Sequence, residues 1–183
     1  MRFSPKDRHY GIEVFDFTPT ATNSVRYFEK IKSALNLIRE YQPHRLARIS
    51  RDVCRILVVK QAAEAEFWPA LKACVLTCGG LELDDDEVAL MIVHEAVHAR
   101  IDARGIPYSR KLRERIEMAC ICEEIAFAEL LPNGAKRVSE LRDQTKNPWW
   151  SNAELFDRRL SLFQQSGAPE WLVRGLRAIF TLR

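Results

Sequence analysis

The sequence predicts an α+β fold that is mostly helical, with a small sheet preceding a pair of long helices. Apolar residues recur at three- and four-residue steps in several segments, the period of an amphipathic helix. Short segments rich in β-branched residues come before the most apolar of these helices. The chain has 183 residues, of which 47% are hydrophobic, so it can bury a sizeable core. We therefore expect a single domain over residues 1–183.

The N-terminal part predicts one short strand and one long helix. Residues 12–17 combine apolar and aromatic residues, as a short strand does. A helix is expected from Ser24 to Tyr41, because apolar residues recur there at helical spacing. These residues are Val25, Phe28, Ile31, Leu35 and Ile38. Pro43 is expected to end the helix.

Two further strands are expected before residue 80. Residues 54–59 are rich in β-branched side chains, and residues 72–77 end at the Gly79-Gly80 turn. The segment from Gln61 to Trp68 is predicted as a helical turn that Pro69 stops. These elements complete the expected N-terminal part, residues 1–83, as a helix plus a small sheet.

A hairpin of two helices is expected over residues 84–132. The acidic run at residues 84–87 suits a helix N-terminus, where carboxylates meet the positive end of the helix dipole. The first helix should reach about Arg104 and end at Gly105. The second should run from Arg110 to Leu131, with Ser109 as a candidate N-cap.

Additional helices are expected after the hairpin, over residues 133–183. Their predicted ranges are residues 135–143, 153–165 and 169–181, separated by prolines and glycines. The paired Trp149-Trp150 and Trp171 are interpreted as anchors that attach these helices to the core.

The predicted hairpin contains the sequence His94-Glu95-Ala96-Val97-His98, an HExxH motif. Residues four apart lie on one face of a helix, so both imidazoles can reach one ion while Glu95 lies beside it. Catalytic zinc sites use three protein ligands and leave one position open. The other histidines, His9 and His44, both precede the motif, so a ligand downstream of it must be acidic.

Helix geometry favours Glu117 as the third ligand. His98 lies about 10 Å before Gly105 along the helix axis, at the usual rise per residue. If the second helix turns back antiparallel, Glu117 lies roughly 12 Å past its start and reaches a similar height. Glu123 and Glu124 would lie about 20 Å along it, level with or beyond His94, and they remain alternatives. A glutamate that does not bind the metal can orient a histidine through its free N–H.

Residues 84–132 resemble the gluzincin branch of the zincin metallopeptidases, in which a glutamate ligand on the next helix follows HExxH. Glu117 stands 19 residues after His98, close to the spacing of thermolysin-like enzymes. Residues 127–132, Phe-Ala-Glu-Leu-Leu-Pro, are similar to the end of the ligand helix in ImmA/IrrE-type peptidases, which favours Glu123 or Glu124. The resemblance implies a small zincin-like sheet packed on the hairpin.

The resemblance also implies a function. The expected protein is a zinc-dependent metallopeptidase with one Zn²⁺ per chain, bound by His94, His98 and Glu117. Glu95 would act as general base on a water that the zinc activates. Residues 72–77 would form the sheet edge that pairs with an extended substrate. Tyr108, Tyr10, Tyr41, His44 and the arginines are candidates to stabilise the oxyanion, although Tyr108 can equally be a packing residue.

Charge and composition limit the classes of partner that we expect. A formal charge of +3 gives no reason to expect nucleic acid, and no apolar run approaches the roughly 18 residues of a membrane span. Residues 1–18 lack the apolar region of a signal peptide, and the five cysteines include no CxxC, so we expect a cytoplasmic protein acting on peptides or proteins. The alternatives are a non-catalytic zincin-like regulatory or protein-binding module, and a helical interaction domain without metal.

Overall fold

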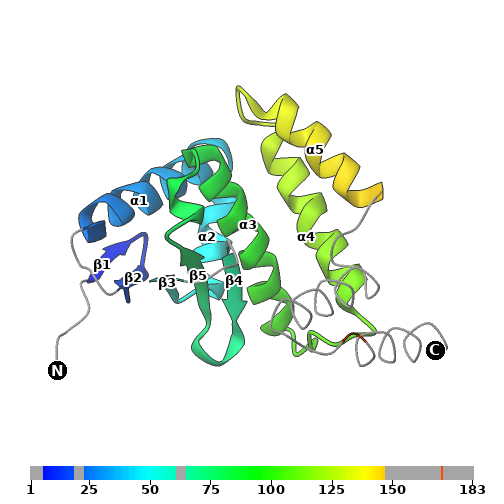
Figure 1. The fold of residues 1–183 in the computed structure, drawn as a ribbon, viewed down its shortest axis with the longest axis horizontal. Helices are drawn as coiled ribbons and strands as arrows, with labels where there is room; N and C mark the ends of the chain where they lie inside the picture. The colour runs from blue at the N-terminus through cyan, green and yellow to red at the C-terminus, as the bar shows by residue number, and fades with distance from the viewer. Residues whose placement is uncertain (1–5, 19–22, 61–64, 147–169, 171–183) are drawn as a thin grey trace.

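The computed structural model describes residues 6–18, 23–60, 65–146 and 170. Over these residues the chain forms helices and one mixed sheet, which confirms the predicted α+β class (Figure 1). The helices expected at residues 153–165 and 169–181 lie outside the described residues, apart from Glu170. So do Trp149, Trp150 and Trp171.

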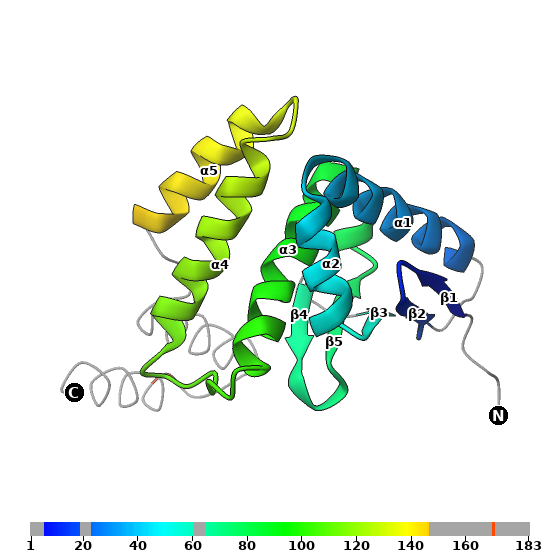
Figure 2. The same cartoon turned by 180° about the vertical axis from the view of Figure 1, so that it is seen from behind.

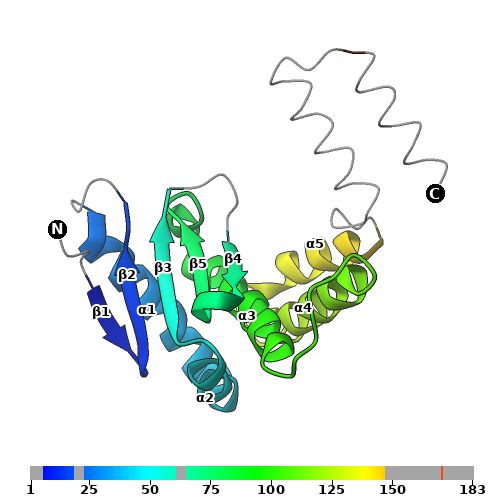
Figure 3. The ribbon, with the colours of Figure 1, turned by 90° about the horizontal axis from the view of Figure 1, so that it is seen from below.

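Among the residues that the structure describes, the sheet has five strands in the order β1-β2-β3-β5-β4 (Figure 3). Parallel pairing joins β2 to β3 and β3 to β5, whereas β1 and β4 are antiparallel to their neighbours. The strands are β1 Lys6–His9, β2 Ile12–Asp16, β3 Arg55–Val59, β4 Ala65–Trp68 and β5 Ala73–Thr77. Strands β2, β3 and β5 confirm the three strands expected from the sequence.

Two predictions about the sheet are wrong. Residues 65–68 were expected in a helical turn, but they form β4, which pairs with β5 in a register that sets Phe67 opposite Cys74. The segment at residues 72–77 was expected at the sheet edge, but β5 lies between β3 and β4. The edge on this side is therefore β4. Strand β1 was not predicted from the sequence.

In the described part of the chain, five α-helices accompany the sheet, with α1 and α2 on one of its faces (Figure 2). They are α1 Ser24–Tyr41, α2 Pro43–Asp52, α3 Asp85–Asp102, α4 Arg113–Ala128 and α5 Gly134–Lys146. The bounds of α1 match the prediction. Pro43 does not simply end α1, because it also occupies the first turn of α2, where its missing N–H costs nothing. Helix α5 confirms the helix expected near residues 135–143.

Helix α3 is the centre of the molecule. Its neighbours are α1, α2, β4 and β5 on one side and α4 on the other, and α5 packs on α4. Its apolar side chains are buried nearly all round, as expected for a helix enclosed by other elements. Strand side chains facing the helices, such as Ile56 and Leu76, are fully buried in the same core. Within the described residues, no helix has both the length and the apolar character needed to cross a membrane.

The connection between α3 and α4 is short and turns the chain back. Gly105 has a φ of 70°, a left-handed conformation that glycine adopts without the steric cost of a Cβ, and this confirms it as the stop of the first helix. Helix α4 begins at Arg113, because the Ser109 carbonyl accepts hydrogen bonds from the N–H groups of Leu112 and Arg113 in a preceding turn. Ser109 is therefore not the N-cap of this helix.

An ion-pair cluster joins three helices. The Glu123 carboxylate on α4 lies 2.7 Å from the guanidinium of Arg45 on α2 and 2.9 Å from that of Arg100 on α3. Burial tends to raise the pKa of Glu123, but the two arginines outweigh it and hold that pKa below its usual value. Glu123 thus has guanidinium partners and fixes α4 against α3 and α2.

We expect Glu123→Gln to lower the free energy of unfolding at pH 7 by about 1–3 kcal/mol, because it removes charged hydrogen bonds. The folded-state pKa of Glu123 is depressed, so its contribution is complete above the unfolded value of about 4.3 and disappears as the pH falls through the lower folded value. The difference from wild type should therefore shrink below about pH 4.

Urea unfolding in the presence of a chelator, measured from pH 7 downwards, tests this expectation. Asp143→Asn is the matched control, since that carboxylate is 67% exposed and pairs only with Lys146 in the same helix among the ion pairs of the described chain. Equal losses in the two variants would contradict a special role for Glu123.

Candidate metal centre

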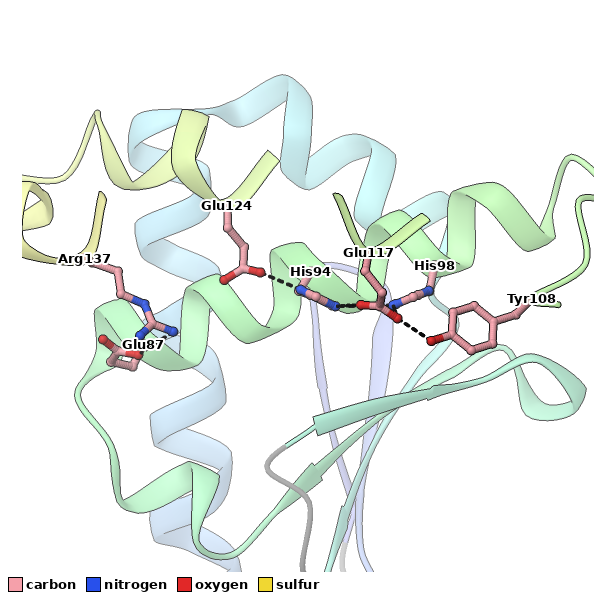
Figure 4. A network of polar contacts seen from close by, with 7 residues as sticks. All are labelled: Glu87, His94, His98, Tyr108, Glu117, Glu124 and Arg137. Carbon is pink, nitrogen blue, oxygen red and sulfur yellow. Dashed lines mark hydrogen bonds and ion pairs between the residues drawn. The ribbon is translucent and has the colours of Figure 1, made fainter. Parts of the chain in front are cut away.

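Helices α3 and α4 bring the motif histidines and Glu117 together (Figure 4). The Nε2 atoms of His94 and His98 lie 3.3 Å apart on adjacent turns of α3. From α4, the carboxylate of Glu117 places one oxygen 3.3 Å from Nε2 of His94 and the other 3.7 Å from Nε2 of His98. The predicted arrangement of two imidazoles facing an acid on the returning helix is therefore present.

Cys120 adds a fourth donor that the sequence analysis missed. One ligand atom from each of His94, His98, Glu117 and Cys120 lies within 4.8 Å of the others, so this group can hold a metal ion. Cys120 follows Glu117 by three residues on α4, which puts both side chains on the same helix face. That spacing was visible in the sequence, but it gains meaning only once the face of α4 turned toward α3 is known.

The distances fit a tetrahedral ion. Nitrogen and oxygen donors about 2.0–2.1 Å from such an ion lie about 3.3–3.4 Å from one another. The 3.3 Å between the two Nε2 atoms and the 3.3 Å from Nε2 of His94 to one Glu117 oxygen are close to this value, whereas the 3.7 Å to Nε2 of His98 belongs to the other Glu117 oxygen. Imidazole, carboxylate and thiol are also the donor types that zinc and its neighbours among the transition metals prefer.

Glu124 orients His94 from the opposite side of the ring. Its Oε1 lies 2.5 Å from Nδ1 of His94, so the Nδ1–H donates to this carboxylate and Nε2 faces the other donors. Metal-binding histidines commonly donate their second N–H to a carboxylate in this way. This geometry matches the expectation that an acid next to the ligands can orient a histidine. Among the three candidate glutamates, Glu117 faces the donors.

The site concentrates negative charge away from water. Glu95, Glu117 and Glu124 are only 6%, 4% and 4% exposed. Burial raises the pKa of Glu95 to about 7; nearby His94 opposes this shift, and the carboxylates of Glu117 and Glu124 add to it. Buried carboxylates need a compensating positive charge, and a bound cation between the helices would supply it.

The two histidines differ in protonation. Burial together with the nearby His94 lowers the pKa of His98 to about 4, so its ring is neutral at pH 7 and can donate a lone pair. Burial also disfavours a charge on His94, but its contacts with Cys120, Glu117 and Glu124 raise its pKa well above the ordinary value. Without an ion, a proton on His94 balances part of the acidic charge. A metal ion would take over that role.

A cavity of about 360 Å³ opens beside these groups. His94, Glu95, His98 and Glu117 line one side of it. The rest of its lining comes mainly from β4, from the C-terminal end of α3 and from the α3–α4 connection, and includes Phe67, Ile101, Ile106 and Tyr108. The candidate metal centre is thus open to a ligand on the side of β4.

Tyr108 belongs to this cavity rather than to the core. Its side chain is 51% exposed, its ring centroid lies 5.4 Å from that of His98, and its hydroxyl donates a hydrogen bond to Glu117. Of the other candidates for oxyanion stabilisation, Tyr10 donates its hydroxyl hydrogen to Asn36, and His44 is exposed on α2. Neither lines the cavity.

The geometry predicts different effects on metal binding for three of the acids of α4. Glu117→Ala should abolish stoichiometric binding of a divalent metal, because it removes a donor. Glu124→Gln should weaken binding about 10–100-fold, the usual effect of removing a partner that orients a ligand. Glu123→Gln should bind metal like wild type, since its partners are arginines.

Metal content after equilibrium dialysis, together with competition against a chromophoric chelator, measures these three variants. Normal affinity in Glu117→Ala combined with loss of binding in Glu124→Gln would exchange the roles assigned to these two residues.

Comparisons with known proteins give no information about the site. No model of a protein family, no curated protein and no solved structure matches the chain at a significant level. The assignment of function therefore rests on the donor geometry of α3 and α4 and on the cavity beside it.

Proposed function

We propose that the protein is a zinc-dependent metallopeptidase whose ion is bound by His94, His98 and Glu117. The observation that carries the proposal is the convergence of both motif imidazoles on the Glu117 carboxylate, at 3.3 Å and 3.7 Å, beside an open cavity. Two histidines and a glutamate form a ligand set that catalytic zinc sites use. Mixed nitrogen and oxygen donors at tetrahedral spacing favour zinc over magnesium or calcium, which prefer oxygen donors.

Glu95 is the proposed general base. It follows the first histidine directly, is buried, and lines the cavity beside the donors. Zinc in such a site acts as a Lewis acid and lowers the pKa of water toward about 7. The pKa of Glu95 near 7 suits a group that accepts a proton from water and returns it to the leaving amine at neutral pH.

An extended peptide is the proposed substrate. Strand β4 has one partner, β5, within the described sheet, and its residues Ala65, Glu66 and Phe67 line the cavity. A peptide lying along β4 could extend the sheet through backbone hydrogen bonds, with its scissile carbonyl directed toward the donors. The apolar side chains of Phe67, Ile101 and Ile106 favour an apolar residue next to the cleaved bond.

Glu95→Gln tests the proposed chemistry most directly. The variant should bind zinc as wild type does but lose peptide cleavage by at least about 10²–10⁴-fold, because the amide cannot accept the proton. His94→Ala is the companion variant and should lose both zinc and cleavage. Hydrolysis of casein and of a peptide library, with zinc content measured on the same samples, provides the readout.

The same experiment separates the alternative. Wild-type protein that binds zinc but cleaves none of these substrates would support a non-catalytic zincin-like regulatory or protein-binding module. Cleavage that survives in Glu95→Gln would contradict the assigned base, and protein without stoichiometric zinc would contradict the whole proposal.

Tyr108 is the proposed donor to the developing oxyanion. Burial and the hydrogen bond to Glu117 raise its pKa, so the hydroxyl keeps its proton at neutral pH. Tyr108→Phe should lower kcat by about 10²-fold or more, as the loss of one oxyanion donor does, while KM changes little. Steady-state kinetics with zinc-saturated protein measure this. A loss confined to zinc affinity would instead assign Tyr108 to positioning Glu117.

A further inference from the structure

We propose that Cys120 is a fourth protein ligand that closes the metal site in the resting protein and must leave before peptide hydrolysis. The inference rests on the proposed function, since it concerns the coordination position that the reaction needs. Its basis is the place of the thiol within 4.8 Å of the donor atoms of His94, His98 and Glu117.

The position of Cys120 suits a ligand. The residue lies on the α4 face turned toward α3, one helical turn after Glu117, and its sulfur lies within 4.8 Å of the donor nitrogen of His94. It is fully buried among Val97 and Ile116. Cys122 is a useful contrast, because it lies two residues further on and is exposed.

Both the protons and the charges balance when Cys120 binds the ion. Burial raises the pKa of the free thiol to about 11, so the side chain is protonated at pH 7 without an ion. A divalent ion bound by sulfur displaces that proton to solvent, and metal binding releases protons whenever a ligand deprotonates. Two neutral imidazoles, one carboxylate and one thiolate then neutralise the two charges of the ion.

An ion bound by Cys120 in addition to His94, His98 and Glu117 has no open position, and this has a functional consequence. Four protein ligands are typical of structural zinc sites, whereas catalytic sites use three and leave a position for water or substrate. With the Cys120 thiolate in place, the fourth position is occupied. Peptide hydrolysis by the proposed mechanism then requires the sulfur to leave, so Cys120 limits activity while it strengthens metal binding.

X-ray absorption of the zinc-loaded protein, together with the visible and near-ultraviolet spectrum of the cobalt-loaded protein, tests the proposal. Wild type should show a sulfur shell at about 2.3 Å in addition to nitrogen and oxygen at about 2.0–2.1 Å, and a sulfur-to-cobalt charge-transfer band. Cys120→Ser and Cys120→Ala should lose both signals, and Cys122→Ser should keep them.

Affinity and activity provide a second readout. Cys120→Ala should bind zinc at least about tenfold more weakly than wild type and, at saturating zinc, cleave peptides several-fold faster per bound ion. Cys74→Ala is the control for loss of a buried thiol, because Cys74 lies on β5 and is absent from the donor group. Thermal unfolding in a chelator identifies any variant that fails to fold, and the wild-type spectra remain decisive in that case.

The outcomes distinguish this proposal from the function on which it rests. Zinc bound without a sulfur shell would overturn the role of Cys120 and leave the three-ligand peptidase intact. A sulfur shell that survives in Cys120→Ala would also overturn it. A sulfur shell lost in Cys120→Ala without faster cleavage would overturn the closure of the site. Absence of bound metal in every sample would overturn both proposals.

Discussion

The burial of acidic side chains between α3 and α4 is the constraint on which the rest of the structure depends. Glu117 and Glu124 are almost entirely enclosed, and a buried carboxylate costs several kcal/mol unless a charge or hydrogen-bond donor compensates it. Their partners come from α3 and the following loop, namely His94, His98 and Tyr108. The two helices can therefore pack closely only in the register that brings these groups together. A cation at their meeting point would relieve the remaining negative charge.

The surrounding fold holds that register. Helix α3 is fixed by apolar packing against α1 and the sheet, so its histidine face can point only toward α4. The Arg45–Glu123–Arg100 cluster ties the middle of α4 to α2 and α3 on a different side of the helix. The adjacent residues Glu123 and Glu124 thus have different structural roles. Glu123 holds the helix in place, and Glu124 orients a ring within the site.

The sequence predicts elements whose signal is local and misses those that depend on distant partners. Helix α1 has an apolar residue at every third or fourth position, and helix α3 has an acidic first turn and a glycine just after its end, so the extents of both helices follow from their own residues. Strand β4 has only four residues, and its pairing with β5 decides its conformation, so a helical turn was an equally good local interpretation. In the site, the HExxH spacing predicted the imidazoles, and the rise of the returning helix favoured Glu117. Cys120 was missed because a single cysteine carries no signal until the facing side of α4 is known.

Glu117 and Glu124 lie on one face of α4, but only Glu117 belongs to the donor group, and their spacing along the helix explains this. Glu117 and Glu124 are seven residues apart, or about 10 Å along the axis, too far for both to reach one ion. His94 lies between them and uses both of its nitrogens, with Nε2 toward Glu117 and Nδ1 toward Glu124. Glu124 therefore fixes the orientation of the His94 ring, and with it the direction in which Nε2 points toward Glu117. Cys120 lies on α4 between the two acids, one helical turn after Glu117, so the returning helix turns a thiol as well as a carboxylate toward His94 and His98.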